Sequence, residues 1–214
     1  MTSNNDCGSG NGYPSDCDIT RGLLKKAAEK SAKDPRGYVW KSSLPKAEPV
    51  KLLLLDVDGV LTDGTLLFTD HGTEFKGFNS KDGFGIRLLQ EAGVQVGIIT
   101  ARQSDAVAKR AENLKLSHVY QGSGNKIEVF EKILRENELT ARQVAYMGDD
   151  WLDFKLLRAA GFAAAPADAV REVRNIVDYV TTVPGGRGAV REVCELIVEA
   201  KGKFESFLER YLNS

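Results

Sequence analysis

Hydrophobic positions along this chain of 214 residues follow two alternating patterns. Short continuous apolar runs are typical of strands buried on both faces of a parallel sheet, and we predict them at residues 51–57, 94–99, 119–120, 143–147, 162–164 and 179–180. Apolar residues at helical spacing predict helices at 84–92, 104–114, 125–136, 151–160, and from 188 past 203 toward Leu212. The alternation predicts an α/β fold, with a mostly parallel sheet, right-handed crossovers and flanking helices.

Two segments lie outside this alternation. Residues 65–69 and 73–78 predict the strands of a β-hairpin, because Asp70-His71-Gly72 suits a short connecting loop. The N-terminal stretch is polar, with a short helix expected over 19–33 and a proline-containing linker after it. We predict three parts: a polar extension at 1–48 that is partly disordered or helical, an α/β domain at 49–203, and a helical C-terminal tail at 204–214.

Polar residues follow the predicted strands at the places where ligands bind in parallel sheets, beyond the carboxyl ends. Asp56 and Asp58 follow the first strand, Thr100 follows the second, Lys126 comes after the third, and Asp149 follows the fourth. A turn explains one aspartate after a buried strand, but two like charges there are costly unless a cation or a reaction needs them. Lysine at a helix start is also unfavourable unless an anion binds nearby.

These residue types together indicate phosphate chemistry. Asp56, Asp58 and Asp149 would meet at one cation site with oxygen ligands and no Cys or His, which favours Mg²⁺ over Zn²⁺. Thr100 and Lys126 would hold a phosphate opposite the cation. Carboxylates, a divalent cation, a lysine and a hydroxyl donor form a phosphoryl-transfer site.

The motifs resemble those of the haloacid dehalogenase-like phosphatases. They occur in the family's order as LDVDGVLTDG at 55–64, Thr100, Lys126 and GDDWLD at 148–153. Within that family the chain resembles capless enzymes that hydrolyse phosphate esters of 2-keto sugar acids, through FNSKDGFGIRLL (78–89), YQGSGNK (120–126), VAYMGDDWLD (144–153) and GGRGAVREVCELI (185–197). The resemblance implies a Rossmann-like core with a β-hairpin insertion. The gap between the hairpin and Thr100 and the gap from Lys126 to Gly148 each hold one helix and one strand, which leaves no room for a cap domain.

The resemblance also implies the roles of the motif residues. Asp56 would be the nucleophile that becomes an aspartyl phosphate, and Asp58 would be the general acid and then the general base. Mg²⁺ would be held by the Asp56 carboxylate, the Asp58 main-chain carbonyl and the Asp149 carboxylate. Thr100 and Lys126 would neutralise the transferring phosphoryl group. Behind these groups, two further aspartates would support the metal ligands and the lysine: Asp150 and Asp153.

Further residues are expected to contact the substrate around the phosphate. These are Asp58, Thr62, Thr100, Ala101, Arg102, Lys126 and Arg187, with Lys81 as a weaker candidate. The two arginines suit a sugar-acid carboxylate because the guanidinium donates two parallel hydrogen bonds. Residues 185–188, GGRG, are expected to form a flexible loop that brings Arg187 to a neighbouring active site.

The implied activity is Mg²⁺-dependent hydrolysis of a phosphomonoester in lipopolysaccharide precursor synthesis. The preferred substrate is an eight-carbon 3-deoxy-octulosonate 8-phosphate. The alternative substrate is the 9-phosphate of a nine-carbon nonulosonate, a sialic-acid-like sugar. Two other functions are considered: a non-catalytic assembly domain, like the one that ends some acylneuraminate cytidylyltransferases, and a phosphomutase. Phosphomutases usually carry a cap that excludes water, which this chain has no room for.

Composition narrows the class of partner. The 29 Lys and Arg residues balance 30 Asp and Glu residues, which argues against a nucleic-acid binder. There is no apolar run of about 20 residues to span a membrane and no signal-like segment, so a cytoplasmic location is expected. The expected partners are a sugar acid phosphate and further copies of the chain, because the apolar hairpin and the resemblance both favour a homotetramer whose sites are closed by a neighbouring subunit.

Overall fold

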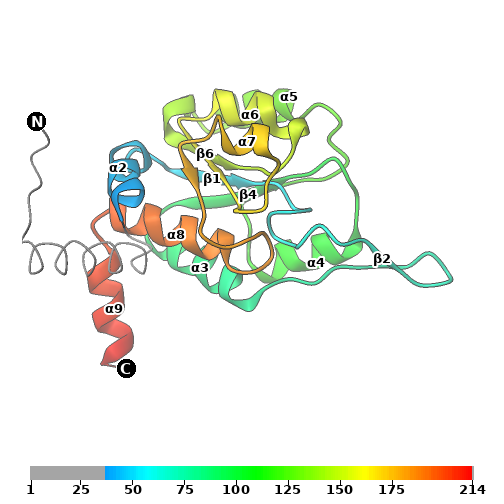
Figure 1. The fold of residues 1–214 in the computed structure, drawn as a ribbon, viewed down its shortest axis with the longest axis horizontal. Helices are drawn as coiled ribbons and strands as arrows, with labels where there is room; N and C mark the ends of the chain where they lie inside the picture. Colours follow the sequence, from blue (N-terminus) through cyan, green and yellow to red (C-terminus); the bar gives the residue numbers. More distant parts are fainter. Residues whose placement is uncertain (1–36, 214) are drawn as a thin grey trace, which may run out of the picture. The chain divides into compact units, whose positions relative to one another are not determined.

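The computed structural model describes residues 37–213, and Figure 1 shows how their helices and strands are arranged. Six strands form one parallel sheet in the order β5-β4-β1-β6-β7-β8. Their bounds are β1 Leu52–Leu55, β4 Gln95–Ile99, β5 His118–Tyr120, β6 Val144–Met147, β7 Phe162–Ala165 and β8 Tyr179–Val180. The structure confirms the predicted α/β fold with its parallel sheet.

The central strand β1 consists of four leucines that are buried on both faces. Leu53 and Leu55 point into one apolar core, and Leu52 and Leu54 point into the other. Strands β4 and β6 flank β1 in register, so that Leu55 lies beside Ile98 on one side and Met147 on the other. The segments that follow these three strands therefore begin side by side at one edge of the sheet.

Helices cover both faces of this sheet (Figure 1). Residues of α3, α4 and α8 contribute to the core that contains Leu53 and Leu55, whereas α5, α6 and α7 contribute to the other core. The bounds are α3 Ser80–Glu91, α4 Asp105–Asn113, α5 Lys126–Glu136, α6 Phe154–Ala159, α7 Arg171–Arg174, α8 Ala189–Ala200 and α9 Phe204–Leu212, with 3-10 turns η1 Ala141–Gln143 and η2 Trp151–Asp153. The short α7 and η1 were not predicted.

The linker predicted before residue 49 is wrong for Tyr38–Ala47, which form helix α2. Trp40 and Ala47 are buried, and the Trp40 ring lies edge-on to Tyr179 with centroids 5.9 Å apart. Pro45 falls in the last turn of the helix, where the loss of one N–H donor interrupts few hydrogen bonds. This helix belongs to the same compact unit as the sheet. The helix expected over 19–33 lies outside the described residues.

Two other elements differ from their predictions in extent. The hairpin strands are short, β2 Leu67–Phe68 and β3 Glu74–Phe75, and the hairpin extends away from the main sheet (Figure 1). Four of its apolar side chains are 44–57% exposed: Leu66, Leu67, Phe68 and Phe75. The C-terminal helix is split into α8 and α9 because Gly202 adopts a positive φ of 66° and ends the first helix. Within residues 37–213, no helix is both long and apolar enough to cross a membrane.

Candidate active site

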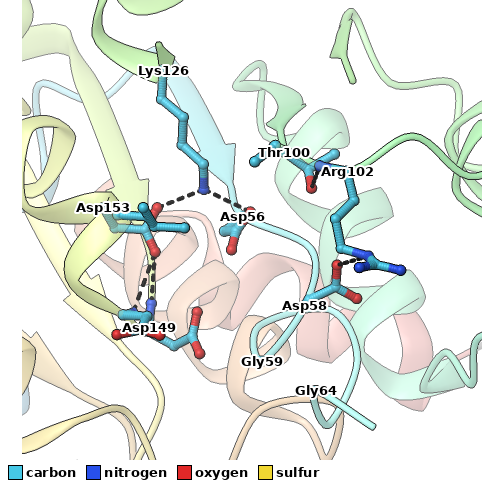
Figure 2. Close-up of a pocket in the computed structure, with 12 residues that line it drawn as sticks. Asp56, Asp58, Gly59, Gly64, Thr100, Arg102, Lys126, Asp149 and Asp153 are labelled. Atoms are coloured by element: carbon cyan, nitrogen blue, oxygen red, sulfur yellow. Dashed lines mark hydrogen bonds and ion pairs between the residues drawn. The ribbon is translucent and has the colours of Figure 1, made fainter. Parts of the chain in front are cut away.

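A cavity of about 230 Å³ opens at the carboxyl edge of the sheet, between the segments that follow β1, β4, β5 and β6 (Figure 2). Among its lining residues are nine that the sequence predicted: Asp56, Asp58, Thr100, Ala101, Arg102, Lys126, Asp149, Asp150 and Asp153. Gly59, Gly64 and Leu152 also line it. Thr62, Lys81 and Arg187 are absent from this lining, so the structure brings most of the predicted site together but not these three.

The loop that follows β1 packs closely against the Asp149 carboxylate. The Asp56 N–H donates to the Met147 carbonyl at 2.9 Å, which extends the β1–β6 pairing by one residue. Gly59 has a φ of +83°, and a Cβ atom at this position would lie 2.1 Å from Asp149 Oδ2. A side chain at residue 59 would therefore displace the Asp149 carboxylate from the cavity.

Lys126 holds two of the aspartates together from the start of α5. Its Nζ lies 2.8 Å from Asp56 Oδ1 and 2.7 Å from Asp153 Oδ1, and only 6% of its side chain is exposed (Figure 2). The buried Tyr146 hydroxyl donates to the same Asp153 oxygen at 2.5 Å. Asp153 Oδ2 accepts the Asp149 amide at 3.1 Å. Asp153 thus orients Lys126 toward Asp56, as the sequence analysis expected of a supporting residue. Tyr146 was not predicted.

Burial and mutual repulsion raise the pKa of the two innermost metal-ligand candidates. The pKa of Asp56 rises to about 6, chiefly through desolvation and next through the Asp153 charge, while Lys126 opposes the rise. The pKa of Asp149 rises to about 7, through desolvation and then through Asp56 and Asp153. Burial alone would lower the pKa of Lys126, but the two aspartates outweigh it and the pKa is raised. The protein therefore concentrates negative charge that a cation would stabilise.

Asp56, Asp149 and Asp153 each offer a carboxylate oxygen, and these three oxygens lie within 4.8 Å of one another. Desolvated carboxylates at this spacing fit a hard divalent cation. Two of the three, Asp56 and Asp149, are the predicted carboxylate ligands. Asp153 already accepts hydrogen bonds at both of its oxygens, which suits it to supporting the site instead.

Asp58 faces the cavity from the opposite side and is held by the hairpin. Lys76 Nζ forms an ion pair with Asp58 Oδ1, and Arg102 Nε lies 3.6 Å from Asp58 Oδ2. Glu74 Oε1 bridges the two cations, at 2.7 Å from Arg102 Nη2 and 3.4 Å from Lys76 Nζ. The hydrogen bond from Arg102 lowers the pKa of Glu74, so this carboxylate stays ionised. Sequence analysis did not predict Lys76 or Glu74. The available signal was a Lys and a Glu on either side of an exposed Phe.

Thr100 and Arg102 sit in the turn that follows β4. The Thr100 hydroxyl oxygen accepts the Arg102 N–H at 3.3 Å, which leaves the hydroxyl proton available to an anion in the cavity. The Arg102 side chain is 44% exposed at the rim. Its guanidinium can therefore reach a ligand as well as Asp58 and Glu74.

The GGRG segment forms the loop predicted before α8, and its first two glycines pack against another loop. Gly186 N–H donates to the Val60 carbonyl at 2.9 Å, so the segment packs against the loop after β1. A Cβ atom on Gly185 would lie 1.8 Å from the Gly59 carbonyl oxygen. The glycines allow two backbones to pack closely, which is the physical reason for their presence here.

Arg187 lies outside the cavity of its own chain. It is 66% exposed and forms an ion pair with Asp63 at 3.2 Å. The buried Thr62 hydroxyl donates to the Val57 carbonyl at 3.4 Å and accepts the Gly64 N–H at 3.3 Å, so this residue shapes the loop rather than lining the cavity. Contact of either residue with a substrate therefore stays a prediction.

Comparison with known proteins identifies the family. A model described as haloacid dehalogenase-like hydrolase matches residues 117–191. The 3-deoxy-D-manno-octulosonate 8-phosphate phosphatase of Escherichia coli strain K12 is 43% identical over 169 residues, which cover 79% of this chain and 90% of that protein. The chain belongs to the 3-deoxy-D-manno-octulosonate 8-phosphate phosphatase family. Membership makes it a phosphoric monoester hydrolase and confirms the resemblance drawn from its motifs.

Solved structures of this phosphatase family share the fold. The Yersinia pestis phosphatase is 40% identical with a TM-score of 0.75, and the match covers 76% of this chain and 88% of that chain. The Moraxella catarrhalis phosphatase is 39% identical with a TM-score of 0.78, and the match covers 79% of this chain and 98% of that chain. The Moraxella structure is a complex with a magnesium ion, a phosphate ion and a KDO molecule. The predicted fold class, a capless haloacid dehalogenase-like core, is thereby confirmed.

Proposed function

We propose that this chain hydrolyses 3-deoxy-D-manno-octulosonate 8-phosphate to the free sugar acid and phosphate, through an aspartyl phosphate on Asp56 and with Mg²⁺ bound. The observation that carries the proposal is the cavity in which Asp56 lies 2.8 Å from Lys126 Nζ and in which Asp58, Thr100 and Asp149 also take part. The names of the relatives and the ligands of the Moraxella structure support this substrate and this metal.

The metal would be held by carboxylate oxygens of Asp56 and Asp149, with the main-chain carbonyl of Asp58 as the expected third protein ligand. When bound, Mg²⁺ would neutralise charge on the phosphoryl oxygens. The geometric support is the carboxylate cluster, in which burial and then repulsion from Asp56 and Asp153 raise the pKa of Asp149 to about 7. The nearest supporting residue, Asp153, would keep Lys126 and the Asp149 backbone in place.

In the first step the ionised Asp56 carboxylate attacks phosphorus, and the bond between phosphorus and the sugar oxygen breaks. The carboxyl proton of Asp58 passes to that sugar oxygen, so the product is a neutral alcohol. Lys126 and Thr100 stabilise the charge on the transferring phosphoryl oxygens. With a pKa of about 6, Asp56 is mostly ionised at neutral pH, as a nucleophile must be.

In the second step Asp58, now a carboxylate, takes a proton from water. The water oxygen attacks phosphorus, and the bond from phosphorus to Asp56 breaks. Phosphate leaves and both aspartates regain their starting protonation states. The contacts of Asp58 with Lys76 and Arg102 hold its side chain at the cavity.

The substrate proposal also depends on the rim of the cavity. Arg102 is the exposed cation there, and its planar donor group suits the carboxylate of a sugar acid. A nine-carbon nonulosonate 9-phosphate has the same carboxylate and is the alternative substrate. A non-catalytic assembly role is disfavoured because the nucleophile, the lysine and the acid-base carboxylate all face one cavity.

Assembly and location remain predictions. The exposed Leu67, Phe68 and Phe75 of the hairpin support a homotetramer, whose neighbouring subunit would close the site. Light scattering tests this directly, and a mass of 23.4 kDa in solution would contradict it. The expected cytoplasmic location can be tested by fractionating the native host.

Phosphate release from three esters tests the proposed activity: 3-deoxy-D-manno-octulosonate 8-phosphate, a nonulosonate 9-phosphate and an aryl phosphate. Each is measured with Mg²⁺ and with a chelator. We expect metal-dependent release with a clear preference for the eight-carbon ester, and no release by Asp56→Asn. Preference for the nine-carbon ester would retain the mechanism and change the substrate. Equal release by wild type and Asp56→Asn would refute the catalytic role of this site.

A further inference from the structure

The base of the hairpin carries a buried lysine whose charge is directed at the proposed acid-base residue. Lys76 follows β3 directly, and its side chain is 1% exposed although its neighbour Phe75 is 56% exposed. Its ammonium contacts Asp58 Oδ1 and lies 3.4 Å from Glu74 Oε1. A lysine that directly follows a two-residue strand of an exposed hairpin would normally extend into water, so the burial of its side chain requires an explanation.

We propose that Lys76 is a positioning residue for Asp58, and that the hairpin supplies the group that holds the acid-base carboxyl in line with the scissile bond. This proposal rests on the proposed function, because Asp58 has an acid-base role only if the cavity hydrolyses a phosphate ester. Lys76 touches neither substrate nor metal in this scheme. It acts through Asp58 alone.

The placement of the charges supports a positioning role over substrate binding. Asp58 lines the cavity, whereas Lys76 and Glu74, both within the described residues, do not. The Lys76 ammonium therefore contacts Asp58 from the protein side. One carboxylate oxygen of Asp58 is bound by Lys76, and the other lies 3.6 Å from Arg102 Nε at the rim. Contacts at both oxygens restrict rotation of the carboxyl group about its last torsion angle.

Because the Lys76 side chain is removed from water, its ammonium group must be paired with anionic groups. An ammonium group removed from water is stable only with anionic partners, and Asp58 and Glu74 are the partners that Lys76 has. Glu74 also holds Arg102 at 2.7 Å, so one carboxylate anchors both cations that contact Asp58. Loss of the Lys76 charge would release Asp58 Oδ1 and leave the carboxyl oriented by Arg102 only.

The leaving group of the substrate separates a positioning role from a merely structural one. An alkyl ester leaves as a strongly basic alkoxide, which needs the proton from Asp58. A nitrophenyl ester leaves as a stable phenolate, which does not. The ratio kcat/KM includes only steps up to departure of the leaving group, so the later hydrolysis of the aspartyl phosphate does not affect it. Misplacing Asp58 should therefore lower kcat/KM far more for the alkyl ester than for the aryl ester.

The experiment compares kcat/KM for a sugar acid phosphate and for 4-nitrophenyl phosphate, in wild type, Lys76→Met and the exposed-lysine control Lys155→Met. We expect Lys76→Met to lose about 10²-fold on the sugar ester and only a few-fold on the aryl ester, with Lys155→Met unchanged on both. Lys76→Arg, which retains the charge, should recover part of the loss on the sugar ester. An equal loss on both esters would show that Lys76 only maintains the fold and would overturn the proposal.

A second variant keeps the test decisive if Lys76→Met does not fold. Glu74→Gln removes the shared anchor with little change in volume, and it should show the same leaving-group preference with a smaller amplitude. Equal effects of Glu74→Gln on the two esters would also overturn the proposal. Failure of the proposed function would look different, because wild type itself would then release no phosphate from the sugar ester.

Discussion

The two sides of the cavity are built in different ways. On one side, which we call the core wall, Asp56, Lys126, Tyr146 and Asp153 come from the sheet and its helices, and they are held by buried contacts of 2.5–2.8 Å. On the other side, the hairpin wall, Asp58 is held by Lys76 of the hairpin and Arg102 of a surface turn, and Glu74 contacts both cations. Parallel strand register fixes the core wall, whereas ion pairs near the solvent fix the hairpin wall.

This difference separates two parts of the chemistry. In the proposed mechanism, the core wall places the nucleophile and the positive charge for phosphoryl transfer, which every phosphate ester needs. In the same mechanism, the hairpin wall places the proton donor and the exposed cation of Arg102, whose importance depends on the leaving group. Under the proposed function, a small insertion beside the phosphoryl-transfer core adapts it to one kind of ester.

The largest effect is expected when Asp56, the proposed nucleophile of the core wall, is replaced. Asp56→Asn should abolish phosphate release from alkyl and aryl esters alike, because no carboxylate remains to attack phosphorus. The same change removes a desolvated charge whose pKa is raised to about 6, so the metal-free variant should unfold at a higher temperature than metal-free wild type at pH 8. Phosphate assays and thermal unfolding in chelator measure both, and a destabilised variant would contradict the electrostatic account.

The second-largest effect is expected when the positive charge of Lys126 is removed from the core wall. Lys126→Met should lower kcat by about 10²–10³-fold on both esters, because the transferring phosphoryl group loses a pre-positioned charge. Lys132→Met, on the exposed face of the same helix α5, is the matched control and should retain wild-type activity. If Lys126→Met lowered kcat only for the alkyl ester, the assignment of different chemical roles to the two walls would be wrong.

When the metal is removed, the stability of the folded protein should depend on pH through the carboxylates of the core wall. The pKa values of Asp56 and Asp149 are raised to about 6 and 7, above the ordinary aspartate value of 3.8 that applies in an unfolded chain. The folded state therefore binds these protons more tightly, and this contribution to stability is lost as pH rises from 4 through 7. Lys126 stays charged over this range and adds no slope.

We accordingly expect the unfolding temperature in chelator to fall between pH 5 and pH 8, and Mg²⁺ to raise it more at pH 8 than at pH 5. Differential scanning calorimetry provides the measurement. In the Asp149→Asn variant, the unfolding temperature in chelator should fall less between pH 5 and pH 8. An unfolding temperature equally sensitive to Mg²⁺ at both pH values would argue that the cation binds elsewhere.

The smallest expected effect tests the support of Lys126. Tyr146→Phe removes the hydroxyl that donates to Asp153 at 2.5 Å while the ring stays in the core. The free energy of unfolding should fall by about 2 kcal/mol, the usual net contribution of one hydrogen bond to a charged group. Denaturant titration measures this change, and kcat should fall equally for alkyl and aryl esters. A selective loss on the alkyl ester would place Tyr146 functionally with the hairpin wall.

Most residues of the core wall could be predicted from the sequence because local sequence patterns determine their positions. Four leucines followed by Asp56 predict a buried strand and a charge at its end, and parallel topology then brings Lys126 and Asp149 to the same edge. Such reasoning needs only strand periodicity and chain order. It missed Tyr146 because a tyrosine within a buried strand has the same pattern as any core aromatic.

The hairpin wall and the contacts of the GGRG segment escaped prediction for a different reason. Lys76 looks like an ordinary surface residue in sequence, and only the folded hairpin shows that it turns inward to Asp58. Gly185 and Gly186 suggested flexibility because glycine is permissive, yet their neighbours across space require close packing. Helix α2 was obscured by Pro45, although Trp40 and Ala47 carry its buried face. These features depend on contacts between distant segments.

The packing of Gly185 and Gly186 against the loop after β1 has a consequence for synthesis of the chain. The loop that carries Asp58 and Gly59 leaves the ribosome early, but one of its backbone supports, the Val60–Gly186 hydrogen bond, is made more than a hundred residues later. The two flanking strands of β1 also come later, at residues 95–99 and 144–147. A nascent chain released before residue 186 would therefore carry Asp56 and Asp58 in an incompletely supported loop. Catalytic competence should arise only after residue 186 has been synthesised.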